Sequence, residues 1–304
     1  MIDKTRTGVA FIDSRYGGVY RGRPFLVSGR SGAGKTVLGL QFALQGIQQD
    51  ERTLMLSVWR AKDLIIMAES LGLPMSAAVA KGMLALLEYS DFVPGRDREA
   101  QWTLPPDGFL QLQNFIDQHA IRRVVLDTVL PWIALRTNPE KLSEHLFSFV
   151  RAFERMGVTA LFTMPRPVSP AAFRLKNKLE ELMPIAITLQ RTEDAVGHWL
   201  CIVTKYLGEA CVDEGIAYQI VRGVGMTERI APVPSPTSAA ASPQRAISPP
   251  ATHPAPAPAP EPPASDPALR EAGAPAGAAR RILFSSVISG MENNPPASNQ
   301  RGGR

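Results

Sequence analysis

A loop of small residues near the N-terminus carries the residue types that bind a phosphate group. The stretch FLVSGRSGAGKT (residues 25–36) fits the spacing G-x-x-x-x-G-K-[ST]. In this pattern small residues let backbone N–H groups close around a phosphate, a lysine reaches its oxygens, and a hydroxyl ligates Mg²⁺. The expected phosphate and metal ligands are Gly29, Ser31, Gly32, Ala33, Gly34, Lys35 and Thr36.

The residues on either side of the loop supply the structural context that the motif requires. Phe25 to Ser28 form a short apolar run that predicts a buried strand. Residues 36–49 place Val37, Leu40 and Leu44 on one face, which predicts an amphipathic helix. A strand, a loop and a helix N-terminus together favour anion binding over a glycine-rich turn that matches by chance.

A second candidate ligand lies at the end of a later strand. The stretch RRVVLDT (residues 122–128) carries four strand residues to Asp127. Many strands end in an aspartate, so this signal is weak alone, but it gains weight downstream of a phosphate loop. The Asp127 carboxylate is expected to hold the Mg²⁺ water shell beside Thr36.

The remainder of the first 230 residues alternates between strand and helix patterns. Helices are expected over residues 61–72, 106–120, 139–156 and 173–183. Further strands are expected over residues 53–58, 83–89, 158–164, 185–190, 199–205 and 216–221. This order predicts an α/β fold whose mostly parallel sheet is flanked by helices and ends in antiparallel edge strands.

The last quarter of the 304-residue chain has a different composition. More than half of the 27 prolines lie beyond residue 230, so residues 231–279 are expected to be disordered or polyproline II, as are residues 293–304. Between them, residues 280–292 form an apolar island that predicts an amphipathic docking helix for a protein partner. The alternative is residual apolar sequence without a partner.

Charge and cysteine content limit the class of protein. A net charge of +5 and a pI near 9.4 permit nucleic-acid contact, but they describe a solvated basic surface equally well. Cys201 and Cys211 lack metal-ligand spacing and are expected to be free thiols. The N-terminus lacks an apolar leader pattern and no run approaches membrane-spanning length, so we expect a cytoplasmic protein without membrane contact.

Four stretches in this order resemble one family. They are RTGVAFIDSRYGGVYRGRPFLVSGRSGAGKT, RRVVLDT, GVTALFTM and YLGEACVDEGIAYQIVRGVG. Residues 1–230 resemble a single KaiC-type domain of the RecA-like P-loop ATPases. The resemblance implies a RecA-like fold, ATP and Mg²⁺ as ligands, a homo-oligomeric ring that is typically hexameric, and a link to clock or signalling output.

The chain departs from the family pattern in three places. Where the family has two glutamates, one of which activates the attacking water, this chain has Trp59 and Arg60. Asp63, one helical turn on, is a weaker substitute, so the catalytic residue stays unassigned. Lys205 matches a family lysine that reaches the neighbouring subunit's nucleotide, but the accompanying arginine is Leu207. Glu180 and Glu181 stand where clock proteins carry a phosphorylated Ser-Thr pair.

These features predict an ATP-binding regulatory module in which hydrolysis is weak or lost. The alternative is a recombinase-related accessory ATPase that binds DNA through the basic stretch MPRPVSPAAFRLKNK (residues 164–178). Phe173 is the only aromatic residue in that stretch, which argues against base stacking. A third alternative keeps full turnover through an unrecognised base.

Overall fold

The protein forms a helix-covered β-sheet. The structure is a computed structural model that describes residues 3–88, 106–133, 139–192, 198–211, 214–229 and 287–288. The main sheet has the strand order β11-β10-β9-β8-β3-β7-β6-β4-β5-β12. Its parallel part comprises β8 (Ile185–Arg191), β3 (Pro24–Gly29), β7 (Thr159–Pro165), β6 (Arg123–Asp127), β4 (Thr53–Ser57) and β5 (Leu84–Glu88).

Antiparallel strands extend this sheet beyond β8, as the sequence predicts. They are β9 (Trp199–Tyr206), β10 (Ile216–Val221) and β11 (Gly225–Glu228). A separate two-stranded sheet near the N-terminus joins β1 (Lys4–Thr5) to β2 (Val19–Tyr20). The expected α/β class, with a mostly parallel sheet and an antiparallel C-terminal edge, is therefore confirmed.

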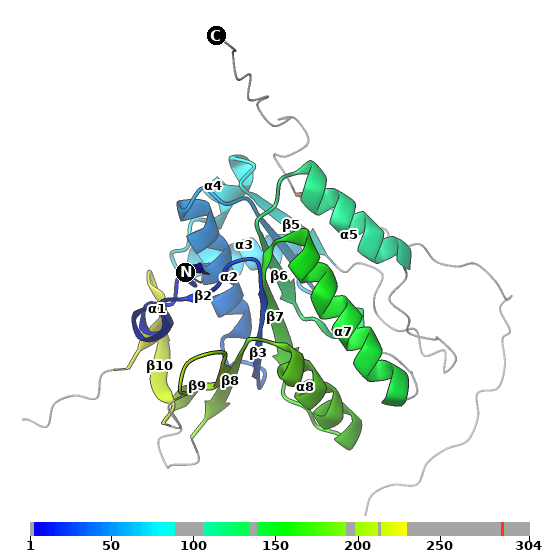
Figure 1. The fold of residues 1–304 in the computed structure, drawn as a ribbon. Coiled ribbons are helices and arrows are strands. Elements are labelled where there is room, and N and C mark those ends of the chain that lie inside the picture. Colours follow the sequence, from blue (N-terminus) through cyan, green and yellow to red (C-terminus); the bar gives the residue numbers. More distant parts are fainter. Residues whose placement is uncertain are drawn as a thin grey trace, which may run out of the picture. The chain divides into compact units, whose positions relative to one another are not determined.

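Helices cover both faces of the sheet (Figure 1). One core lies beneath α1 (Ala10–Tyr16), α2 (Lys35–Gln48), α3 (Ala61–Ser70) and α4 (Met75–Ala80). The other core lies beneath α5 (Pro106–Gln118), α6 (Leu130–Ile133), α7 (Pro139–Met156) and α8 (Pro170–Leu182). Every residue from Val124 to Leu126 in β6 is apolar because the strand is buried on both faces. Val125 points into the first core, whereas Val124 and Leu126 point into the second.

Two predicted helices need correction. The helix expected over residues 61–72 ends at Ser70, and a second helix, α4, follows Pro74. The docking helix expected over residues 280–292 is wrong for Val287 and Ile288, which form strand β12 instead. A β-branched pair favours extended backbone, which the helical pattern of apolar residues did not reveal. The rest of residues 280–292, and the expected disordered segments, lie outside the described residues.

The cysteines fit the expectation of free thiols. Cys201 is buried and Cys211 is half-buried, and neither forms a disulfide. Burial raises the pKa of the Cys201 thiol to about 12, so this thiol stays protonated and unreactive at neutral pH. No helix in the described part of the chain is both long and apolar enough to cross a membrane.

A buried arginine ties the N-terminal segment to the sheet. Arg123 begins β6 at the edge opposite Asp127, and its side chain is fully buried. Its guanidinium forms an ion pair with Glu51 and lies 4.6 Å from the centre of the Phe42 ring. It also donates hydrogen bonds to the Thr5 hydroxyl at 2.6 Å and to the Arg6 carbonyl at 2.9 Å. The segment before α1 is thereby held against the end of α2.

The charge of Glu51 depends on its arginine partners. Burial alone would raise the pKa of the Glu51 carboxyl, but hydrogen bonds and charges from Arg123 and Arg21 outweigh it. The pKa therefore lies below its ordinary value of 4.5 in the folded protein. A carboxyl whose pKa is lower in the folded than in the unfolded protein stabilises the fold at pH values above its unfolded-state pKa. This stabilisation is lost as the pH falls through the folded-state pKa.

We predict that Glu51→Gln lowers the free energy of unfolding by about 3 kcal/mol or more at pH 7, because it leaves a buried charge without its partner. Urea denaturation between pH 7 and pH 3 measures this, and the difference from the wild type should shrink toward acid pH. The control is Glu181→Gln, whose pair with Lys178 is exposed. Equal, small effects of both variants at pH 7 would contradict the role assigned to Arg123.

Candidate functional site

The phosphate-loop residues lie between β3 and α2 at the carboxyl edge of the sheet. Gly34, the residue before α2, has a left-handed backbone with φ of 88°, which favours glycine. A Cβ atom added to Gly32 would meet no atom within 4 Å, so the loop is open on that side. The Lys35 ammonium folds back onto the loop and donates to the carbonyls of Gly29 at 3.0 Å and Arg30 at 2.8 Å.

The Lys35 side chain is partly buried, so its ammonium is partly desolvated. Burial lowers the pKa of its ammonium, and the charge of Asp127 opposes only part of this shift. The ammonium has lost part of its hydration, and the negative charge nearby does not fully replace it. Binding of an anion such as a phosphate is therefore favourable. The neighbouring helix N-terminus adds a partial positive charge on the same side.

The structure brings together the two residues predicted to bind the metal. The Thr36 hydroxyl donates to Oδ2 of Asp127 at 2.9 Å. Asp127 is buried and also accepts hydrogen bonds from the hydroxyl of Thr163 at 2.7 Å and that of Ser57 at 3.3 Å. The carboxylate thus has a fixed orientation.

Ser57 and Thr163 were missed at the sequence level. Ser57 ends β4, and Thr163 lies near the end of β7. Both strands are direct neighbours of β6, which carries Asp127. Hydroxyl residues near the carboxyl ends of buried parallel strands are the signal that could have identified them.

A hairpin from the C-terminal part of the domain packs on the phosphate loop. The buried Tyr218 on β10 donates a hydrogen bond from its hydroxyl to the carbonyl of Ala33. A Cβ atom on Gly34 would approach Ile220 Cδ1 to 2.9 Å and Met226 Cε to 3.0 Å. Strands β10 and β11 therefore hold the loop backbone from outside, a contact that no local motif predicts.

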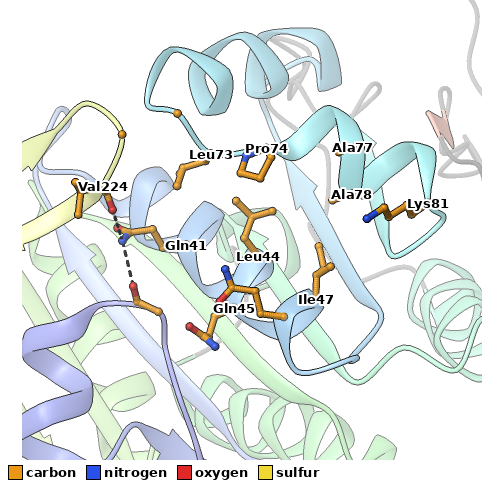
Figure 2. A pocket seen from close by; sticks show the side chains of 14 residues that line it. Gln41, Leu44, Gln45, Ile47, Leu73, Pro74, Ala77, Ala78, Lys81 and Val224 are labelled. Atoms are coloured by element: carbon orange, nitrogen blue, oxygen red, sulfur yellow. Dashed lines mark hydrogen bonds between the residues drawn. The ribbon is translucent and has the colours of Figure 1, made fainter.

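The same hairpin is fastened to helix α2 by Gln41 (Figure 2). The Gln41 amide donates to the carbonyls of Gly8 at 3.1 Å and Val224 at 3.3 Å. Its oxygen accepts from the backbone N–H of Met226 at 2.8 Å. Beside it lies a pocket of about 440 Å³, whose lining residues include none of the phosphate-loop residues 29–36.

Trp59 and Arg60 lie in the turn after β4, at the same edge of the sheet as Asp127. Trp59 is 47% exposed, and Arg60 is exposed at the start of α3. Trp59 is therefore not a core packing residue. The Glu88 carboxylate at the end of β5 accepts the backbone N–H of Ala61 at 2.7 Å and so fixes the start of α3.

The structure does not bring Lys205 to the phosphate loop of its own chain. Lys205 pairs with Ala186 on β8, and Ala186 pairs with Leu26, three residues before Gly29. Its ammonium donates to the carbonyls of Glu180 at 3.0 Å and Glu181 at 2.8 Å, at the C-terminal end of α8. Within one chain, Lys205 therefore caps a helix.

The fold and the site together define a class of protein. A helix-covered parallel sheet, a G-x-x-x-x-G-K-T loop between β3 and α2, and an aspartate at the end of β6 characterise a RecA-like P-loop ATPase domain. The profile of the KaiC ATPase family matches residues 5–223. The chain belongs to this family.

Curated relatives of the chain include circadian clock oscillator proteins named KaiC. The protein from Synechococcus elongatus is 30% identical over 169 residues, which cover 54% of this chain and 32% of the relative. The protein from Nostoc sp. is 29% identical over 168 residues, which cover 54% of this chain and 32% of the relative. The match thus spans about a third of the length of these relatives.

We predict that Tyr218→Phe weakens nucleotide binding about five- to tenfold, because the Ala33 carbonyl loses the hydrogen bond that orients the loop. Calorimetric titration with ATP·Mg²⁺ measures the change in Kd. The control is Tyr206→Phe, which removes hydrogen bonds to the carbonyls of Tyr16 at 3.2 Å and Gly18 at 2.9 Å, elsewhere in the domain. Equal losses of affinity in both variants would contradict a specific effect of Tyr218 on the phosphate loop and would indicate that it only stabilises the fold.

Proposed function

We propose that this chain is a nucleotide-dependent regulatory module that binds ATP with Mg²⁺, hydrolyses it slowly, and works as a homo-oligomer. The hydrogen bond between Thr36 and Asp127 beside the phosphate loop is the observation that carries the nucleotide site. The regulatory role is supported by the relatives, whose names describe a circadian clock oscillator protein.

The residues present fit ATP and Mg²⁺. The Thr36 hydroxyl and the Asp127 carboxylate are hard oxygen donors, which Mg²⁺ prefers. Among the described residues no group of three or more His, Cys, Asp or Glu could hold a metal by itself. This donor set suits an ion that keeps waters and is shared with substrate phosphates. There it would neutralise phosphate charge, while Lys35 and the loop N–H groups orient the phosphates.

We predict that Lys35→Ala abolishes the rise in melting temperature that ATP·Mg²⁺ gives the wild-type protein. Ligand binding to the folded state alone stabilises it by mass action, about 2.7 kcal/mol at a ligand concentration 100 times Kd. Thermal unfolding with and without nucleotide measures the shift. The matched control is Lys62→Ala, an exposed lysine on α3. A shift that survives in Lys35→Ala would place the nucleotide elsewhere.

Slow hydrolysis is proposed from the turn after β4. Trp59 and Arg60 carry no group that accepts a proton from water at neutral pH, and the nearby Glu88 carboxylate is engaged by the backbone of Ala61. Asp63 is exposed on the first turn of α3 and is the weaker substitute. Positioning of the attacking water supplies a large part of catalysis in phosphoryl transfer, so its loss costs orders of magnitude in rate.

We predict that Trp59→Glu combined with Arg60→Glu raises ATP turnover at least tenfold, because a carboxylate returns beside an intact phosphate loop. Phosphate release measures the rate, and adding Lys35→Ala to the double variant should abolish the gain. Asp63→Asn in the wild-type background tests the substitute base. Brisk turnover by the wild-type chain, unchanged in Asp63→Asn, would contradict the proposal.

The oligomer is proposed from the position of Lys205. Its ammonium caps the end of α8 instead of contacting the phosphate loop of its own chain, which leaves a nucleotide in a neighbouring copy as the ligand that the family resemblance implies for it. We predict that ATP·Mg²⁺ shifts the full chain toward a multimer, measured by light scattering after size exclusion. Lys205→Ala should weaken this shift, while Lys62→Ala should leave it unchanged. A strict monomer with and without nucleotide would refute the site shared between subunits.

The DNA-binding alternative has less support. Two of the basic residues in its loop and helix are engaged in ion pairs, Lys176 with Glu180 at 2.6 Å and Lys178 with Glu181 at 2.9 Å. Both pairs lie along helix α8, so Glu180 and Glu181 serve as ion-pair partners on its surface. Binding of single-stranded DNA that falls steeply with salt, in the presence of ATP, would favour the alternative.

A further inference from the structure

The edge strand β5 has an apolar composition that is unusual for the border of a sheet. Its residues Leu84 to Leu87 are at most 2% exposed. Leu84 and Leu86 belong to the first core, and Ala85 and Leu87 to the second. Strand β4 pairs with one side of β5, so the N–H and C=O groups of the other side need a separate partner. An apolar edge of this kind recruits another strand unless it is covered.

The strand that covers this edge comes from the far end of the chain. Strand β12 runs antiparallel to β5, with Val287 opposite Leu87 and Ile288 opposite Leu86. The sequence around it, ILFSSVIS (residues 282–289), combines β-branched and aromatic residues and contains no charge. Such a composition suits strand addition, in which main-chain hydrogen bonds supply affinity.

We propose that the outer edge of β5 is a peptide-docking site of the strand-addition type, and that its occupant is the chain's own C-terminal segment centred on Val287–Ile288. Val287 and Ile288, which the sequence pattern placed on a docking helix, would instead act as a docking strand within the same chain. There they cover an edge that would otherwise join foreign strands.

The connecting sequence is long enough for this occupant. Strand β11 ends at Glu228 and β12 begins at Val287. A fully extended chain spans at most about 3.3–3.6 Å per residue, so a connection of this length sets no limit on reaching β5. A tethered segment competes with added peptide through an effective concentration on the order of 1 mM. Free peptide should therefore bind poorly until the tethered strand is removed.

The test uses a fluorescent peptide that corresponds to residues 280–292 and three full-length proteins. In Val287→Pro with Ile288→Pro, the tethered segment loses both N–H groups of β12. The matched control, Ala278→Pro with Ala279→Pro, places the same change in the preceding sequence. We expect anisotropy titrations to show peptide binding at least tenfold tighter for the first variant than for the wild type and the control.

Hydrogen exchange gives a second measurement on the same proteins. The amides of β5 that point away from β4, near Leu86 and Leu87, should exchange faster in the β12 variant than in the wild type or the control, and added peptide should restore their protection. Failure of the peptide to bind the β12 variant would overturn the docking site. Equal binding to all three proteins would overturn the intrachain occupant, as would wild-type protection that rises with protein concentration.

Discussion

The Asp127 carboxylate is the group on which the geometry of the site depends. It accepts hydroxyl hydrogen bonds from Thr36 on α2, Ser57 on β4 and Thr163 on β7. A buried carboxylate needs hydrogen-bond donors to offset its lost hydration. The three hydroxyls supply them, and they thereby fix α2, β4 and β7 relative to β6. Because Thr36 directly follows the phosphate-loop lysine, the same contact sets the start of α2 and the position of the loop above the sheet.

The loop is constrained from two further directions, and both involve segments distant in sequence. The β10–β11 hairpin presses Ile220 and Met226 against Gly34, while Tyr218 holds the Ala33 carbonyl. At the opposite edge of the sheet, Arg123 binds Glu51 and holds the N-terminal segment against the end of α2. Helix α2 is thus fixed at both ends, so the loop of mostly small residues before it is held in shape by contacts from other segments.

The sequence predicts the parts of this arrangement that are local. The strand before the phosphate loop, the helix after it and the strand ending in Asp127 follow from periodicity and short motifs, and the sheet class follows from their order. Ser57, Thr163 and Tyr218 could not be predicted, because their roles arise from the strand order. Val287 and Ile288 were misassigned, because an apolar spacing compatible with a helix face carries no information about an open strand edge 200 residues away.

The separation of the site over several strands bears on how binding and hydrolysis are related. The proposed phosphate contacts lie in the loop after β3 and the proposed metal ligand at the end of β6, and Trp59 and Arg60, which resemblance aligns with the family's glutamates, lie in the turn after β4. Substituting Trp59 and Arg60 in that turn leaves the hydrogen bonds of Thr36, Asp127 and Thr163 in place. The contacts that orient the phosphate loop and Asp127 therefore do not depend on a carboxylate in that turn. Under the proposed function, such a domain would signal through nucleotide occupancy rather than turnover, and slow hydrolysis would lengthen the bound state.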